Sequence, residues 1–164
     1  MNEYLSYIKH YNDDSMHASS ILCKEGELDE HWHTCYEIEF ICSGEGIVNI
    51  NGKEFFFEKG TIHFVTPTDF HYYVFSKDTL IKKITFNDFV LNIHSVASKV
   101  LLSGFKLMNT SSQQFEWFNA MFDKLIHEYD RNSPYKQEYM AHTINLILTE
   151  FAKKIIWKSL RTMT

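Results

Sequence analysis

The chain has 164 residues, enough for one domain and too few for an enzyme with a separate cofactor module. A hydrophobic fraction of 45% and a charged fraction of 23% exclude disorder, and a formal charge of -5 argues against nucleic-acid binding by the chain alone. We find no apolar run that predicts a membrane span and no signal peptide, so we expect a cytoplasmic protein without membrane contact.

After an N-terminal arm over residues 1–17, short strands separated by turn signals predict an all-β region over residues 18–90. The clearest reversal is Asn51-Gly52, a pair that favours a two-residue type I′ hairpin. Such strands must form a sandwich or small barrel to protect their edges. We expect the strands to span residues 19–24, 32–42, 46–50, 54–58, 62–66, 71–75 and 80–86.

The remaining residues, 91–164, have a different pattern. Residues 88–112 predict only a weak helix or an irregular crossing, and apolar residues at helical spacing then predict a helix over residues 113–130. Ser133-Pro134 supplies a helix start, so we expect a second helix over residues 134–158. Its apolar face is wide, which favours a second subunit as a packing partner over purely internal packing. The predicted dimerisation residues are Met140, Ile144, Ile147 and Phe151.

The segment from His31 to Cys42 separates polar from apolar side chains. Alternation along a strand places His31, His33, Glu37 and Glu39 on one face. The polar face is either a ligand surface or an ordinary solvent-exposed face, and the pattern alone leaves both open. The opposite face predicts core packed against the C-terminal helices, and it carries Trp32, Tyr36, Ile38 and Phe40.

Two clusters in this region resemble the motifs of the cupin family. The first is Gly26, His31-x-His33, Glu37 and Gly44, and the second is Gly60, Pro67 and His71. The resemblance implies a mainly β protein with a cupin barrel (double-stranded β-helix or jelly roll), inside which the three histidines and Glu37 converge. Asp69 stands where the second motif usually has glycine, and Phe75 stands where it usually has asparagine.

The segment from His33 to Tyr73 is similar to the N-terminal sensor domains of AraC-type transcriptional regulators. This resemblance implies a barrel that binds a small effector, followed by helices that form a homodimer. Members of that family carry a C-terminal helix-turn-helix domain that this chain lacks, so we expect DNA contact only through a domain that is not present here.

A cavity with carboxylates, imidazoles and an aromatic ring favours a polyhydroxylated or cationic small molecule, and we expect a sugar. Tyr73 has the same parity as His71, and Lys83 could join them from the last strand, where the apolar residues Ile81 and Ile84 fall on both parities. The predicted ligand-binding residues are His31, His33, Glu37, Glu39, His71, Tyr73 and Lys83.

A divalent transition metal (Zn, Mn, Fe or Ni) could bind the same face. Its predicted ligands are His31, His33, Glu37 and His71. With a metal the alternative function is a small metal-dependent cupin enzyme, an isomerase or a dioxygenase. The long helix and the departures in the second motif favour a sensor that is not an enzyme and has no catalytic residues. The inward or outward orientation of His63 stays open.

Overall fold

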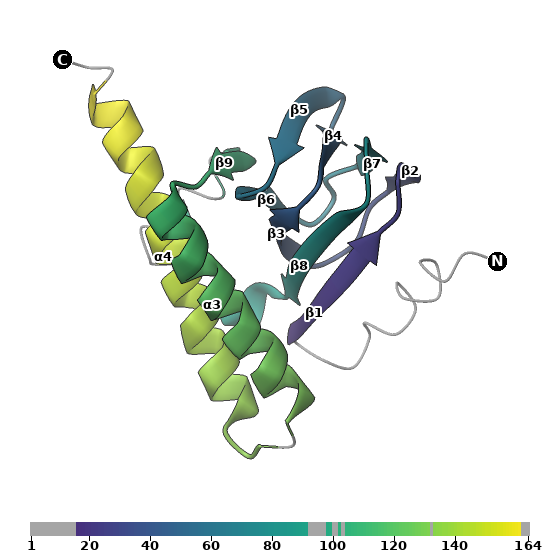
Figure 1. Ribbon diagram of the computed structural model, residues 1–164. Helices are drawn as coiled ribbons and strands as arrows, with labels where there is room; N and C mark the ends of the chain where they lie inside the picture. Colours follow the sequence, from purple (N-terminus) through teal and green to yellow (C-terminus); the bar gives the residue numbers. More distant parts are fainter. Residues whose placement is uncertain (1–15, 92–97, 100–101, 103, 132, 162–164) are drawn as a thin grey trace.

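The computed structural model describes residues 16–91, 98–99, 102, 104–131 and 133–161 (Figure 1). Nearly all of the predicted arm over residues 1–17, and part of the predicted crossing over residues 88–112, therefore lie outside the described residues. The elements are β1 (Met16–Cys23), β2 (Gly26–His31), β3 (Tyr36–Ser43), β4 (Glu45–Ile50), β5 (Lys53–Glu58), β6 (Thr61–Val65), β7 (His71–Phe75), β8 (Thr79–Phe86), η1 (Asp88–Val90), β9 (Leu107–Asn109), α3 (Ser112–Asp130) and α4 (Lys136–Arg161).

Within the described residues the strands form two antiparallel sheets that face each other (Figure 1). One sheet has the order β1-β8-β3-β6-β9, and the other has the order β2-β7-β4-β5. The helices α3 and α4 run side by side along the first sheet, which we call the helix-covered sheet. This arrangement is the mainly β barrel followed by helices that the sequence predicts.

Two strands escape prediction, and one predicted strand is too long. The polar segment of β2 lacks apolar alternation, and β9 is only three residues long. The predicted strand over residues 32–42 begins only at Tyr36 because β2 ends at His31, opposite His71 of β7. Residues 32–35 connect the two sheets, so His31, His33 and Glu37 do not lie on one strand as predicted.

The hairpin between β4 and β5 has the predicted turn. Asn51 and Gly52 have φ values of 53° and 79°, as a type I′ turn requires, and Ile50 pairs with Lys53. Apart from residues 32–35, the predicted strand ends differ from the observed ends by a few residues at most.

Gly44 sits in the turn between β3 and β4 and lies against Thr79 at the start of β8. Its φ is +97°, and a Cβ atom there would lie 2.1 Å from Thr79 Oγ1 and 2.6 Å from Thr79 Cα. We expect Gly44→Ala to cost about 3–5 kcal/mol, because backbone strain and a clash with main chain add together. Gly26→Ala is the matched control: φ is +136° but nothing lies within 4 Å, so we expect a loss of about 1–2 kcal/mol. Urea unfolding of both variants measures the difference, and equal losses would contradict the clash.

Both predicted helices are present. Ser111 caps α3, and the side chain of Gln114 returns a hydrogen bond to the Ser111 backbone, which forms a capping box. The helix ends at Asp130, as predicted. The second helix, α4, begins at Lys136, and its predicted end at residue 158 falls short of Arg161. No described helix is long and apolar enough to cross a membrane.

The helix-covered sheet separates two cores. Its outer face packs against α3 and α4 through Ile38, Phe40 and their neighbours, and Tyr36 stacks on Phe86 at 5.4 Å. This confirms the predicted core for three of the four residues of the apolar face. Trp32 is an exception, because it lies in the connection before β3 and is 50% exposed. The barrel interior holds a second apolar cluster: Ile41, Val48, Ile50, Phe57, Val65, Tyr73, Phe75 and Ile81.

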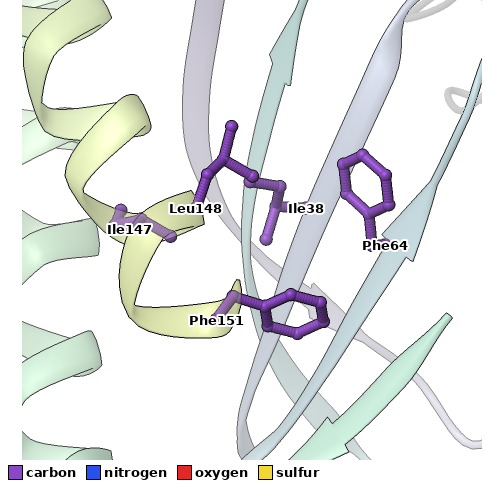
Figure 2. Close-up of a pocket in the computed structure, with 5 residues that line it drawn as sticks. All are labelled: Ile38, Phe64, Ile147, Leu148 and Phe151. Carbon is purple, nitrogen blue, oxygen red and sulfur yellow. The ribbon is translucent and has the colours of Figure 1, made fainter. Parts of the chain in front are cut away.

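The predicted dimerisation residues of α4 are covered by their own chain. Met140, Ile144, Ile147 and Phe151 are at most 3% exposed and belong to the core between helices and sheet. Figure 2 shows two of them, with Leu148, around a small apolar pocket against Ile38 of β3 and Phe64 of β6. Assigning this stripe to a dimer surface is therefore wrong, because the barrel and α3 already cover the wide apolar face.

Candidate functional site

Ionisable side chains line the barrel interior from strands of both sheets. On β3, Glu37 and Glu39 point inward and are 2% and 1% exposed. Glu39 lies opposite His63 of β6 on one side and opposite Lys83 of β8 on the other. The second sheet contributes His71 and Tyr73 of β7, with His31 of β2 opposite His71. Of the seven predicted ligand-binding residues, all but His33 come from strand positions on the face of this interior, and His33 lies in the connection over residues 32–35.

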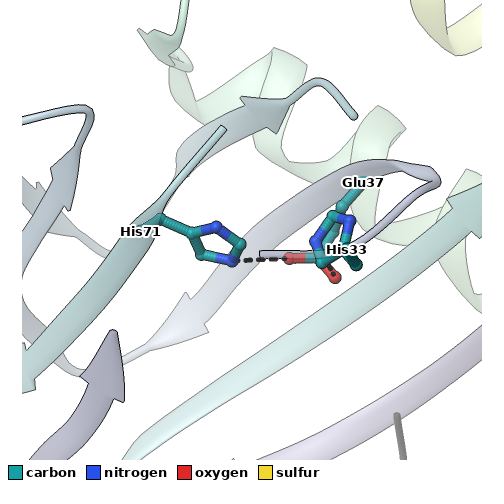
Figure 3. Close-up of side chains that lie close together, drawn as sticks. All are labelled: His33, Glu37 and His71. Atoms are coloured by element: carbon teal, nitrogen blue, oxygen red, sulfur yellow. Dashed lines mark ion pairs between the residues drawn. The ribbon is translucent and has the colours of Figure 1, made fainter. Parts of the chain in front are cut away.

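The outer part of the interior, toward the connection over residues 32–35, is a cluster of two imidazoles around one carboxylate. His33 Nε2 lies 3.5 Å from Glu37 Oε2, and His71 Nε2 lies 3.7 Å from Glu37 Oε1 (Figure 3). These distances permit ion pairing but are longer than good hydrogen bonds. We call these three residues the outer triad.

Backbone carbonyls orient the histidines. The Nδ1 atom of His33 lies 2.8 Å from the Cys35 carbonyl oxygen, and the Nδ1 atom of His71 lies 3.2 Å from that of Asp69. Because a carbonyl only accepts, each Nδ1 carries the proton and each Nε2 is directed to Glu37. The Nδ1 atom of His31 likewise lies 2.8 Å from the carbonyl oxygen of Asp29 and carries the proton. The ring of His31 lies 4.2 Å from the ring of His71.

The protonation of the outer triad follows from these contacts. Burial would lower the pKa of His33, but the nearby Cys35 side chain and the carboxylate of Glu37 raise it to about 10. Burial lowers the pKa of His71. Burial would raise the pKa of Glu37, but the ammonium of Lys83 and the ring of His33 hold it well below its usual value. Glu37 is therefore an ionised carboxylate inside the barrel.

A second group lies one step deeper along the same strands, and we call it the inner cluster: Glu39, His63, Tyr73 and Lys83. Lys83 Nζ bridges the two carboxylates, at 2.8 Å from Glu37 Oε2 and 3.2 Å from Glu39 Oε1. The Tyr73 hydroxyl donates to Glu39 Oε2, and His63 Nδ1 lies 3.9 Å from the same oxygen. Burial would raise the pKa of Glu39, but Lys83 lowers it.

His63 is the functional residue that sequence reasoning left open. It points inward and is 0% exposed, and its ring lies 5.5 Å from that of Phe57. Every residue of β6 is buried, since one face meets the helices and the other the interior, so the strand shows no polar alternation that could have oriented His63. Its register opposite Glu39 could have been found only by pairing β6 with β3.

Several buried polar atoms in the interior lack a hydrogen bond. Among the residues that the structure describes, buried side-chain nitrogen and oxygen atoms without a hydrogen bond are His33 Nε2, Glu37 Oε1, His71 Nε2, both ring nitrogens of His63, and Ser19 Oγ. Ser19 lies on β1, opposite Lys83 of β8. Buried polar groups nearly always have partners, so a group of such atoms in one interior indicates a place for a polar ligand.

The loop between β6 and β7 holds both histidines of the outer triad. Asp69 accepts from Thr66 N at 2.7 Å and Asn51 Nδ2 at 2.6 Å, and it pairs with Lys106. Burial would raise the pKa of Asp69, but Lys106 lowers it. In the same loop Thr68, whose φ is 75°, donates its backbone N–H to the His33 carbonyl at 3.2 Å. Lys106 directly precedes β9, so this loop also connects the site to the segment that leads into α3.

The outer triad has the donor set of a transition-metal site. One nitrogen or oxygen atom from each of His33, Glu37 and His71 lies within 4.8 Å of the others, and their Nε2 and Oε1 atoms lack hydrogen bonds. Two imidazoles and a carboxylate suit Zn, Mn, Fe or Ni, and the carbonyls on Nδ1 are the outer contacts that metal-binding histidines usually make. The predicted fourth ligand, His31, is not part of this group.

Two facing antiparallel sheets around an ionisable interior, with a histidine and carboxylate cluster at one end, define a cupin-type ligand-binding domain. More specifically, the chain belongs to the family of AraC-like ligand binding domains, whose family model matches residues 25–131.

Solved structures with a similar fold include cupins from several bacteria. An RmlC-like cupin from Shewanella frigidimarina has 24% identity and a TM-score of 0.42, covering 43% of this chain and 65% of its own. A predicted oxalate decarboxylase from Thermotoga maritima has 22% identity and a TM-score of 0.40, covering 43% and 64%. The chain thus spans just under two thirds of each. A cupin superfamily protein from Desulfitobacterium hafniense has 15% identity and a TM-score of 0.44, covering 47% and 72%. No curated protein matches the chain.

Proposed function

We propose that this chain is the effector-binding and dimerisation domain of an AraC-type transcription regulator and that a small sugar-like molecule binds inside its barrel. The observation that carries the proposal is the group of buried atoms without hydrogen bonds on His33, Glu37, His63 and His71. Together with Lys83 and Tyr73 they offer both donors and acceptors, which hydroxyl groups can satisfy at the same time. In this role the domain is cytoplasmic, has no catalytic residues and contacts DNA only through another domain of the regulator.

The loop that holds the outer triad supports a regulatory role. Asp69 pairs with Lys106, and two residues after β9 the cap Ser111 starts α3. An effector that moves His33 or His71 acts on this loop and, through Lys106, on the start of the helical pair. Binding energy that differs between two positions of that segment would shift the equilibrium between them.

The same proposal makes the protein a homodimer through α4. Since the stripe through Ile144 is covered by the barrel, the surface available on this helix is the opposite one. There Tyr139 and Leu146 are 40% and 47% exposed and lie seven residues apart, on one face of the helix.

A second function, a metal-dependent isomerase or dioxygenase, is favoured by the outer triad. His33, Glu37 and His71 would hold a divalent ion, which when bound would act as a Lewis acid on a coordinated substrate. Lys83 and Tyr73 would then orient a substrate beside it. We rank this function second because Lys83 already supplies a positive charge to Glu37.

Ligand titration tests the proposed function. A panel of neutral monosaccharides, uronic acids and amino sugars is screened by thermal shift and calorimetry in the presence of EDTA. We expect at least one sugar to raise the Tm by about 5–10 °C at 100 times its Kd. Glu37→Gln and His71→Ala should each lower the affinity for that sugar by at least about 10-fold, because each removes a hydrogen-bonding group inside the barrel.

The control is His142→Ala, which makes the same change at an exposed position of α4 and should leave the affinity unchanged. Unchanged affinity in His71→Ala would remove the barrel interior from the site. Conversion of a sugar by the metal-loaded protein, followed by NMR, would favour the enzyme instead.

A further inference from the structure

The ammonium of Lys83 stands beside the carboxylate that would be the only anionic ligand of a metal in the outer triad. Lys83 Nζ is 2.8 Å from Glu37 Oε2, while Glu37 Oε1 faces His71 Nε2 at 3.7 Å. The side chain of Lys83 is 6% exposed and is held between Glu37 and Glu39, so water screens its charge poorly. An ion in the triad and this ammonium would share one carboxylate.

We propose that Lys83 is a built-in cation that takes the place of a metal charge at Glu37 and lowers the affinity of the outer triad for divalent metals. The inference does not depend on the identity of the effector. Lys83 itself does not bind the ion. Its charge determines how readily the barrel takes up a divalent metal.

Two effects of Lys83 on metal binding oppose each other. Its hydrogen bond to Oε2 orients Glu37, and losing such an outer contact weakens metal binding roughly 10- to 100-fold. Its charge repels a divalent ion a few ångströms away, which weakens binding by more than roughly 10³-fold even at an effective dielectric near 20. Repulsion is the larger effect, so removing the charge should strengthen metal binding.

Cobalt(II) titration of the metal-free protein tests this inference, with visible absorption and calorimetry as readouts. We expect Lys83→Gln to bind Co²⁺ at least about 10-fold more tightly than the wild type, since glutamine keeps an N–H donor and removes the charge. The matched control is Lys82→Gln on the same strand. Lys82 faces the helices, where it pairs with Asp123 at 2.5 Å, so its loss should leave Co²⁺ affinity unchanged.

Two further variants make the test decisive. His71→Ala combined with Lys83→Gln should lose the gain, which places the ion in the outer triad. Glu39→Gln combined with Lys83→Gln keeps the net charge of the interior, and it should fold and retain a gain because Glu37 keeps both of its histidine neighbours. This double variant decides the matter if Lys83→Gln alone does not fold. Equal or weaker Co²⁺ binding without Lys83, or a gain that survives loss of His71, would overturn the inference.

Discussion

Replacing Ile144 by aspartate is expected to abolish cooperative folding or to cost at least about 5 kcal/mol. Ile144 is 0% exposed in the core between α4, α3 and the helix-covered sheet. The substitution removes a buried aliphatic side chain and places a carboxylate in a cluster of buried hydrophobic residues. A loss of this size is a large part of the 5–15 kcal/mol that stabilises a typical domain.

Leu146→Asp is the matched control for the core, because it puts the same charge on the same helix at a position that is 47% exposed and lies on the proposed dimer surface. We expect it to separate the subunits without unfolding them and to change the free energy of unfolding of the single chain by less than about 1 kcal/mol. Urea unfolding followed by circular dichroism, with sedimentation of both variants, measures the contrast. A folded Ile144→Asp monomer with a normal transition would contradict the observed core and return Ile144 to a dimer interface.

Removing Lys83 is the second change with a large expected effect. Lys83→Met leaves two buried carboxylates, Glu37 and Glu39, without their shared cation. We expect a loss of about 3–5 kcal/mol at pH 7, the usual cost of breaking a buried ion pair by removing one partner. The double variant with Glu39→Gln should recover part of the loss, because it removes one of the two repelling charges.

The loss should also depend on pH. In the wild type the pKa values of Glu37 and Glu39 lie below the ordinary 4.5, so their ion pairs contribute stability that is complete above pH 4.5 and lost as the pH falls through the lowered values. Without Lys83, burial and mutual repulsion raise the pKa values of these carboxyls in the folded state, and the variant loses stability as the pH rises. The difference in the free energy of unfolding between the wild type and Lys83→Met therefore becomes smaller as the pH falls from 7 toward 4.

Urea unfolding at several pH values measures this difference. Lys82→Met is the control, because it removes a lysine of the same strand whose partner Asp123 is 57% exposed. Lys82→Met should therefore lower the free energy of unfolding only slightly at every pH. A constant difference between wild type and Lys83→Met over the whole range would mean that Lys83 stabilises the barrel by packing alone.

Local patterns in the sequence predict much of this fold. The Asn51-Gly52 turn, the strands around it and the capped helix that ends at Asp130 depend on neighbouring residues, so their signals are readable. The alternation from Tyr36 to Ile41 correctly separates the helix-facing side from the interior because β3 lies in the middle of its sheet.

Features that depend on distant residues could not be predicted in this way. The depth of Lys83 follows from its place between β1 and β3, and its own strand has buried residues on both faces. The pairing of Asp69 with Lys106 joins residues 37 positions apart. The prediction that Trp32 is a core residue is wrong for a different reason. Residues 32–35 form a loop, so the alternation of a strand does not apply to Trp32.

The register of the helix-covered sheet has a consequence for when the binding site forms. Met16 at the start of β1 lies opposite Phe86 at the end of β8, and β3 lies between β6 and β8, so nearly all pairings in this sheet join distant segments. Folds of this kind form in milliseconds to seconds, whereas a local hairpin such as β4–β5 forms in about 1–10 μs. Glu37, His71 and Lys83 meet only when β8 closes the barrel. A partly folded chain emerging from the ribosome therefore has its hairpin early but no binding site, and a ligand can stabilise only the finished barrel.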